Sequence, residues 1–359
     1  MPGPSEISWT DASWNPVRGC SVVSPGCTNC YAMKQAHRFS GAGQAYDGLT
    51  KLTKGGPVWT GKVRLVPELL DWPLRWRGAQ AARAEGRPSR VFVNSMSDLF
   101  HDDVPDEFIA AVFGVMACSK HVFQILTKRP ERMMRWLRWM EKETDANAPE
   151  LAVQLAANRL GVNLPLHPIK GTLRCYPWPL RNVWLGVSCE DQARADSRVP
   201  LLLQTTAAVR FLSIEPLLGP VNIERALCSC PWPNDAMQTR HLLGCQADTR
   251  RPDDQRRWAG IDWVIVGGES GPGARGCEVA WIRSVVAQCK AADTKCFVKQ
   301  LGARPVHGEG DGFPHLAGDV TRPRTTGDGF GRYFVELRDK KGGDPAEWPE
   351  ALRVREFPS

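Results

Sequence analysis

The sequence predicts an α/β fold, either an α/β barrel or a doubly wound sheet, because short apolar runs alternate with helical patterns along most of the chain. Near-continuous apolar runs rich in β-branched residues are typical of strands buried on both faces of a parallel sheet. Six such runs occur, at Val91–Asp98, Val122–Pro130, Val183–Asp191, Val209–Leu217, Trp263–Gly271 and Cys296–Gly302. Segments with apolar residues at helical spacing lie between them, at Val104–Ser119, Pro130–Glu143 and Ala280–Ala292.

Each predicted strand leads into polar or glycine residues. These residues are Asn94, Ser95 and Asp98, then Thr127 and Lys128, Ser188 and Glu190, Ser213 and Glu215, Gly267, Gly268 and Glu269, and finally Lys299 and Gln300. The C-terminal ends of the strands form the active-site rim of an α/β barrel. Six polar strand ends therefore predict one shared functional face.

The predicted barrel, partial or full, occupies residues 1–302. Two stretches are longer than the connections of a βα unit need, and we interpret them as insertions at about 144–181 and 226–260. From about Val306 the chain is rich in Gly, Asp and Pro. We therefore expect residues 303–359 to form a C-terminal extension that packs on the core.

Composition narrows the cellular setting and the class of partner. The chain has 359 residues and a formal net charge of +7, which favours contact with a polyanion. The first residues lack the apolar stretch of a secretory signal, and no run is long enough to span a membrane. These features predict a cytoplasmic protein without a membrane partner, in which the twelve cysteines are thiols or metal ligands.

Three cysteines near the N-terminus form the most specific motif. Cys20, Cys27 and Cys30 are spaced C-x6-C-x2-C within "GCSVVSPGCTNCYA". A structural zinc site takes four protein ligands, whereas a [4Fe–4S] cluster held by three thiolates leaves one iron free to bind a small molecule. The spacing alone leaves three interpretations open, namely such a cluster, a zinc loop completed by a distant residue, and unligated thiols.

This motif resembles the cluster-binding loop of radical S-adenosylmethionine (SAM) proteins, especially the spore photoproduct lyase branch. Further blocks resemble, in order, a phage and prophage protein family defined by the three-cysteine motif: "FVNSMSDLFHDDVPDEF", "QILTKRPERM", "NVWLGVSCEDQ", "RFLSIEPLLGP", "DWVIVGGESGPGAR" and "FVKQLG". The resemblance covers most of residues 7–302 and the tail "GGDPAEWPEALRVREFP". The best-known radical SAM spacing is C-x3-C-x2-C, so the first spacer is longer here.

The resemblance implies a barrel of the radical-SAM type in which Cys20, Cys27 and Cys30 hold a [4Fe–4S] cluster. An electron donor would reduce the cluster, which would pass an electron to SAM. The resulting 5′-deoxyadenosyl radical would then abstract hydrogen from a substrate.

The same resemblance implies cofactor-binding residues at the strand ends. The segment after the first predicted strand would hold the amino group of SAM through Ser95 and Asp98, whose side chains donate and accept hydrogen bonds. Glu215 would bind a ribose hydroxyl. The turn after the strand that begins at Trp263 contains Gly267, Gly268 and Glu269. It would let the backbone approach the adenine or ribose, since glycine has no side chain. We expect Asp98 and Glu215 to act on the cofactor rather than on the fold.

A second group of potential metal ligands lies in the second insertion. Cys228, Cys230, His241 and Cys245 are spaced C-x-C-x10-H-x3-C. Three thiols and an imidazole can hold zinc in a tetrahedral site, and a metal would help to order an insertion that has little core. The alternative is a loop with unligated thiols.

Two single residues and one charged pattern are further candidates. His101 and Cys189 are candidate catalytic residues, with a surface histidine and an inert buried thiol as the alternatives. Arg129, Arg132, Arg135 and Arg138 recur every third residue beside Trp136 and Trp139. This arginine stripe could track phosphates, or it could be a solvated helix face whose aromatic residues pack inward.

Two functions from different classes follow. The first is a radical-SAM-like enzyme, with a nucleobase, nucleotide or DNA as the preferred substrate by analogy with the lyase branch. The second is a non-catalytic, zinc-stabilised phage protein that binds nucleic acid, supported by the net charge, the arginine stripe and the second Cys/His group.

Overall fold

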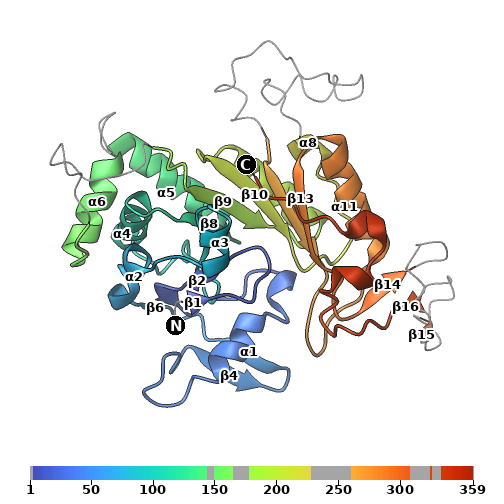
Figure 1. The fold of residues 1–359 in the computed structure, drawn as a ribbon. Coiled ribbons are helices and arrows are strands. Elements are labelled where there is room, and N and C mark those ends of the chain that lie inside the picture. Colours follow the sequence, from blue (N-terminus) through green and yellow to red (C-terminus); the bar gives the residue numbers. More distant parts are fainter. Residues whose placement is uncertain are drawn as a thin grey trace, which may run out of the picture. The chain divides into compact units, whose positions relative to one another are not determined.

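The chain divides into two compact units, one of residues 1–187 with 204–208 and one of residues 188–203 with 209–359. The computed structural model describes residues 3–143, 149–164, 178–227, 260–307, 324–325 and 333–358 (Figure 1). The division falls inside residues 1–302, the segment that the sequence analysis interprets as one core. Both units combine helices with mainly parallel strands, which confirms the α/β class.

The main sheet of the first unit places its strand ends at one edge. Its order is β1 (Gly3–Pro4), β2 (Ala12–Trp14), β7 (Arg90–Val93), β8 (Val122–Thr127) and β9 (Val183–Ser188). β2, β7, β8 and β9 run parallel, and β1 pairs antiparallel with β2. The polar residues that follow β7 and β8 are therefore neighbours in space.

Burial explains why these strands form. Every residue of β9 is buried, and β7 and β8 are buried over most of their length, as expected for strands covered on both faces. Aromatic rings join neighbouring elements, with Trp9 and Phe92 at 4.7 Å and Trp14 and Phe123 at 5.8 Å between centroids. The sequence analysis predicted β7, β8 and β9 but not β2, whose three residues are too few for a periodic pattern.

The helices of the first unit are α2 (Trp72–Arg75), α3 (Gln80–Ala84), α4 (Asp106–Ala117), α5 (Pro130–Glu143) and α6 (Pro149–Arg159). The helical spacing predicted α4 and α5, and α6 lies in the first predicted insertion. α4 and α6 pack against each other (Figure 1). The contact is close at Gly114, where an added Cβ would lie 2.2 Å from the carbonyl oxygen of Val153.

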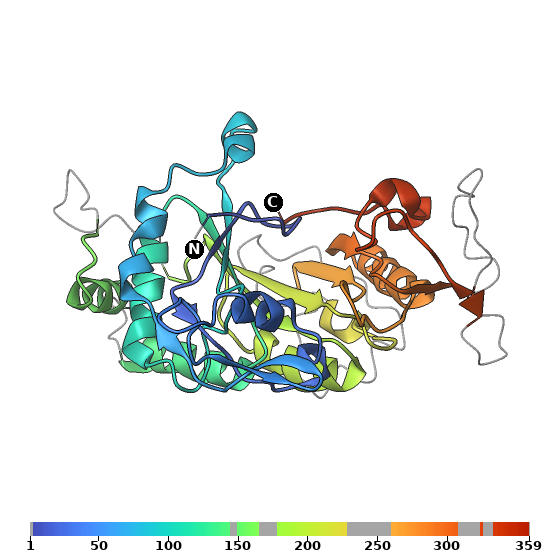
Figure 2. The same cartoon turned by 90° about the horizontal axis from the view of Figure 1, so that it is seen from below.

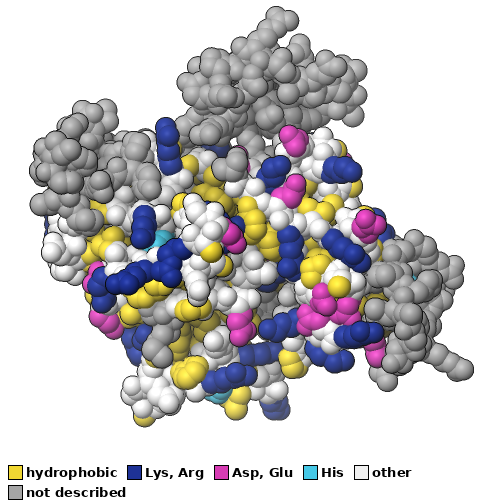
Figure 3. Space-filling view, in the orientation of Figure 1, with side chains coloured by type: hydrophobic (Ala, Val, Ile, Leu, Met, Phe, Trp, Pro, Cys, Tyr) yellow, Lys and Arg dark blue, Asp and Glu magenta, His cyan; other side chains and the backbone are white. Residues whose placement is uncertain are grey.

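A small lobe connects β2 to β7 in the first unit. It contains α1 (Tyr31–His37) and the antiparallel hairpin of β4 (Thr50–Thr53) and β5 (Gly56–Trp59). Short pieces flank it, namely β3 (Val17–Arg18), which pairs with β6 (Arg64–Leu65), η1 (Pro25–Cys27) and η2 (Pro67–Leu69). Figure 3 shows Lys and Arg side chains over the area where Figure 1 draws α1 and β4. We call residues 31–64 the hairpin lobe.

The second unit has its own parallel strands, in the order β10 (Val209–Ile214), β11 (Trp263–Gly267) and β13 (Lys295–Gln300). Its helices are α7 (Gln192–Leu203), α8 (Glu224–Leu227) and α11 (Val279–Ala291), and α11 packs on β11 and β13 (Figure 2). A small sheet joins β12 (Cys277–Glu278), β14 (Pro305–His307), β16 (Tyr333–Phe334) and β15 (Arg324–Thr325). The sequence predicted all three main strands and α11.

The C-terminal segment packs on β13, after η4 (Pro345–Glu347) and η5 (Glu350–Leu352). The amide of Val298 donates to the carbonyl of Val354 at 2.8 Å. The indole of Trp263 donates to the carbonyl of Glu356 at 2.9 Å and lies 5.4 Å from the ring of Phe357. In the described ranges of both units, no helix has the length and apolar character needed to cross a membrane.

We predict that Gly114→Ala lowers the stability of the first unit. Alanine ordinarily stabilises a helix by about 1 kcal/mol relative to glycine. Here its methyl group would overlap the backbone of α6, and overpacking costs about 1–3 kcal/mol. Urea unfolding should therefore show a lower midpoint. Gly55→Ala is the control, because its Cβ would meet only Thr53 Oγ1 at 3.9 Å. A higher midpoint for Gly114→Ala would contradict the prediction.

Candidate metal centre

The cysteine loop is fastened to the segment that follows β7. Gly19 and Ser97 form a parallel bridge, and the hydroxyl of Ser97 donates to the carbonyl of Val17 at 2.7 Å. Only glycine fits at position 19, because φ is +85° and an added Cβ would lie 2.3 Å from the carbonyl oxygen of Lys62. The backbone thus fixes where the loop begins.

The three thiols belong to this one loop and to the start of α1. Cys27 ends η1, and Cys30 is the N-cap residue of α1. All three residues are partly buried, and Cys20 is within electrostatic reach of Cys27 and Cys30. Among the described residues, no group of three or more His, Cys, Asp or Glu side chains is arranged to hold a metal ion.

Burial makes two of the thiols weak acids when no metal is bound. Burial raises the pKa of the Cys20 thiol to about 12; Asp98 raises it further, whereas Arg129 opposes the rise. Burial also raises the pKa of Cys30, and the charge of Lys128 opposes it. A thiolate at either position therefore needs a compensating positive charge.

A buried ion pair between Asp98 and Arg129 lies next to the thiols. Asp98 Oδ2 accepts from Arg129 Nη1 at 2.9 Å, and the two side chains are 7% and 8% exposed. Both carboxylate oxygens accept from the hydroxyl of Thr127, and the amides of Phe100 and Lys128 also donate to them. A carboxylate offers about four acceptor directions, so these donors fill them. Asp98 thus has a structural role, and its direct contact with a cofactor stays a prediction.

Arg129 extends this network into the cysteine loop. Its Nη1 lies 4.0 Å from the sulfur of Cys20, within the range of a hydrogen bond to sulfur, and its Nη2 donates to Ser21 Oγ at 2.6 Å. Burial alone would lower the pKa of Arg129, but the charges of Asp98 and Cys20 raise it above its ordinary value. The guanidinium is a fixed positive charge beside Cys20.

His101 is buried and belongs to the same network. Its Nδ1 accepts from the amide of Asp103 at 3.2 Å, so Nε2 carries the proton and donates to Ser21 Oγ at 3.0 Å. Burial, followed by the charge of Arg129, lowers the pKa of His101 and keeps the ring neutral. The surface-histidine alternative is therefore wrong, since His101 is only 4% exposed. A catalytic role for it stays a prediction.

The end of β7 contains an unused buried donor. Asn94 has a φ of +61° and is buried, and its Nδ2 has no hydrogen-bond partner among the residues the structure describes. Ser95, beside it, donates from Oγ to Asn15 Oδ1 at 3.2 Å. Its carbonyl accepts from the hydroxyl of Tyr31 at 2.7 Å, which ties α1 to this segment.

In the second unit, Glu215 follows β10 and pairs with Lys299, with 3.1 Å between Oε1 and Nζ. Gly267 is the last residue of β11 and Gly268 follows it, and both are needed for packing. A Cβ on Gly267 would lie 2.9 Å from the carbonyl oxygen of Gln300, and one on Gly268 would lie 2.2 Å from that of Leu301. The neighbouring backbone accounts for both glycines, and their contact with a cofactor stays a prediction.

Two other predicted residues of this unit are engaged within the protein. Glu269 accepts from the backbone amide and from Nε of Arg275, both at 2.9 Å, and from its Nη2 at 2.6 Å. This pair closes the loop after β11. Cys189 is completely buried, which favours the inert thiol among the two interpretations of that residue. Cofactor binding by Glu269 and catalysis by Cys189 remain predictions.

The arginine stripe does not form one surface. Arg129 precedes α5 and is buried, whereas Arg132 pairs with Asp106 and donates to Val104. Arg135 and Arg138 are exposed. Trp136 is buried and Trp139 is 42% exposed, so only Trp136 packs inward.

The second group of potential metal ligands lies outside the described residues. Its members are Cys228, Cys230, His241 and Cys245.

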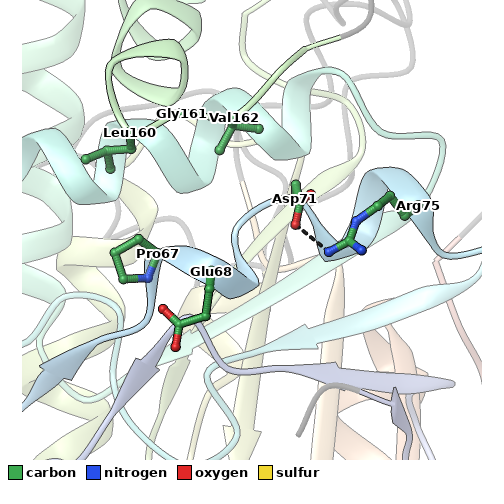
Figure 4. A pocket seen from close by; sticks show the side chains of 7 residues that line it. All are labelled: Pro67, Glu68, Asp71, Arg75, Leu160, Gly161 and Val162. Carbon is green, nitrogen blue, oxygen red and sulfur yellow. Dashed lines mark hydrogen bonds and ion pairs between the residues drawn. The ribbon is translucent and has the colours of Figure 1, made fainter.

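A surface hollow of the first unit lies apart from these residues (Figure 4). The residues that line it are Pro67, Glu68, Asp71, Arg75, Leu160, Gly161 and Val162. Asp71 and Arg75 form an exposed ion pair there at 2.7 Å. None of the predicted site residues lines this hollow.

Sequence reasoning missed the role of Arg129 and the hydrogen bonds that position it. A signal was present, because Pro130 is a typical first helical residue and places Arg129 before the helix. Asn94 and Lys128 were recognised as polar strand ends but not as site residues. Only the pairing of β7 with β8 brings them to the cysteine loop.

Comparison with known protein families identifies one family model that matches the chain. The family model described as a protein of unknown function, DUF5131, matches residues 4–343. No curated protein and no solved structure shows a significant match to the chain.

We predict that Asp98→Asn destabilises the first unit. The substitution leaves the Arg129 guanidinium buried without its counter-charge, which costs about 3–5 kcal/mol. Denaturant unfolding of the metal-free protein measures the loss. Asp102→Asn is the matched control, because Asp102 lies 4.0 Å from Arg129 Nε but is 77% exposed, so it should change stability little. Equal effects of the two substitutions would show that the buried pair contributes nothing to stability.

Proposed function

The chain belongs to the DUF5131 family, and from its cysteine site we propose that it is a radical-SAM-like iron–sulfur enzyme. The proposed enzyme is a partial or full (β/α) barrel of the radical-SAM type that uses a [4Fe–4S] cluster and SAM. One observation carries the proposal. Three thiols of a single loop lie at the carboxyl ends of parallel strands, beside the positive charges of Arg129 and Lys128.

The arrangement of the thiols fits a cluster. A zinc ion holds its sulfur ligands about 2.3 Å from one centre. A cluster spreads its thiolates over several metal atoms. Three thiols that interact electrostatically support a cluster because three thiolates leave one iron of a [4Fe–4S] cluster open, whereas a structural zinc ion takes four protein ligands.

The surrounding residues suit this group. Cys20, Cys27 and Cys30 would hold the cluster, which when bound supplies an electron for the reductive cleavage of SAM. Arg129 places a permanent positive charge beside Cys20, which favours the thiolate that a metal requires.

The substrate and the electron donor are further parts of the proposal. A nucleobase, nucleotide or DNA is the preferred substrate, supported by the net charge of +7 and by the resemblance to the lyase branch. The reaction also requires an external electron donor, because the proposed cluster must be reduced before each cleavage of SAM.

The second candidate function is a non-catalytic, zinc-stabilised phage protein that binds nucleic acid. The net charge favours it. Its arginine stripe is not a single surface, because Arg129 is buried against Asp98. In such a protein Cys27 would be a structural zinc ligand, and its loss would unfold the site.

We predict that Cys27→Ala abolishes cluster binding and SAM cleavage while the metal-free chain keeps its stability. Cys27 is a partly exposed loop residue, so its side chain contributes little to the core. After anaerobic reconstitution, the wild-type protein should contain iron and acid-labile sulfide in equal amounts and convert SAM to 5′-deoxyadenosine and methionine. The variant should do neither.

Cys118→Ala is the control, since it removes a partly buried thiol outside the cysteine loop. It should retain iron, sulfide and SAM cleavage. Zinc without sulfide in the reconstituted wild-type protein, together with loss of stability in Cys27→Ala, would overturn the enzyme and favour the zinc-stabilised protein.

A further inference from the structure

The hairpin lobe is a folded projection with its own core. Figure 1 draws it at the lower end of the first unit, where α1 and the β4–β5 hairpin lie together. Tyr46 and Trp59 meet with 6.4 Å between ring centroids. The buried residues of this core are Ala32, Met33, Ala36, Tyr46, Leu49 and Trp59, together with Met96 from the segment after β7. The core holds the hairpin so that β4 faces outward.

The lobe is strongly basic. Residues 31–64 contain six Lys or Arg and a single acidic residue, Asp47. Lys51, Lys54 and Lys62 are exposed and form no ion pair within the described residues. Figure 3 shows this area with Lys and Arg side chains at the surface. Uncompensated lysines on a projecting ribbon create a positive potential that attracts a polyanion.

The hairpin lobe also exposes apolar side chains. Leu52 is 70% exposed on β4 and Phe39 is 51% exposed after α1. Of the eight large apolar side chains that are exposed in the described part of the chain, three lie in the lobe, namely Tyr31, Phe39 and Leu52. Apolar side chains can insert between bases, and aromatic rings can stack on them. A two-stranded ribbon also fits the major groove of a duplex.

We propose that the hairpin lobe binds a nucleic acid strand. Lys51, Lys54 and Lys62 contact phosphates, while Phe39 and Leu52 contact bases. The surface suits a nucleic acid more than an acidic protein, because lysine is depleted in interfaces between proteins but dominates phosphate contacts. Binding of the strand by the lobe requires no cluster. The inference rests on the proposed function only where it makes the bound strand the substrate of the enzyme.

The lobe would bring the strand to the cysteine site. Cys20 and Cys30 pack against its core. The hydroxyl of Tyr31, the first residue of α1, is bonded to the carbonyl of Ser95. The lobe and the thiols of the proposed cluster are therefore neighbours, and we take the substrate class of that site to be a nucleic acid.

The test measures the affinity of the full chain for short fluorescein-labelled oligonucleotides by anisotropy over a range of salt concentrations. Single-stranded DNA, single-stranded RNA and duplex DNA are the probes. Lys51→Glu combined with Lys54→Glu should weaken binding. It should also make the negative slope of log affinity against log salt shallower by about two, one for each lysine. Phe39→Ala should weaken single-strand binding about tenfold and leave the slope unchanged.

The matched control reverses two charges on α5, through Arg135→Glu combined with Arg138→Glu, and should bind like the wild type. Loss of binding in this control but not in the hairpin variant would overturn the proposal, as would no oligonucleotide binding at low salt. Equal competition by polyglutamate would assign the lobe to an acidic protein and also overturn it. Circular dichroism confirms that each variant is folded.

The same titration with Cys27→Ala separates this inference from the proposed function. Wild-type affinity in that variant supports the lobe as the binding surface, whatever its iron and sulfide content. Loss of oligonucleotide binding in Cys27→Ala with a folded lobe would overturn the claim that the lobe binds without a cluster.

Discussion

The buried ion pair between Asp98 and Arg129 is the interaction on which the proposed metal centre depends. Burying a charged side chain costs about 5 kcal/mol unless the charge is paired and hydrogen-bonded. Here Asp98 comes from the segment after β7, and Arg129 is the second residue after β8. The same guanidinium donates to Ser21 and approaches Cys20, so it joins both strand ends to the cysteine loop. Since β7 and β8 are parallel neighbours, the sheet brings all three segments together.

That arrangement also decides the charge state of the site. Burial keeps the Cys20 and Cys30 thiols protonated, because it raises the pKa of each, and only a metal makes their thiolates favourable. Arg129 and Lys128 reduce the cost of those thiolates without removing it. The hairpin lobe shares its core with two of the cysteines. Residues that order the cysteine loop therefore also support the basic hairpin lobe.

In the second unit, most polar strand ends serve the fold. Gly267 and Gly268 leave room for the backbone beside β13, Glu269 clamps Arg275, and the carboxylate of Glu190 accepts from Arg198 at 3.0 Å. Glu215, paired with Lys299, retains a partly accessible carboxylate. Polar residues at strand ends in an α/β protein can therefore serve the fold or bind a ligand. The buried backbone groups of the adjoining loop need hydrogen-bond partners, and the strand-end side chains often provide them.

The sequence by itself determined the six main strands, the helices α4, α5 and α11, and the cysteine motif, because burial imposes a periodic pattern on neighbouring residues and a metal loop needs close spacing. It could not determine which polar residues pair. Arg129 matched the spacing of Arg132 and was interpreted as part of a helical stripe, yet α5 begins at Pro130. Asp98 is 31 residues away from Arg129, a separation that local sequence patterns do not reveal.

The short strands were also missed. β2, β4 and β5 have three or four residues each, too few for a periodic signal, and their position comes from strand pairing and from the lobe core. Tertiary structure alone decided these features, since contacts between distant segments depend on strand order and not on sequence spacing.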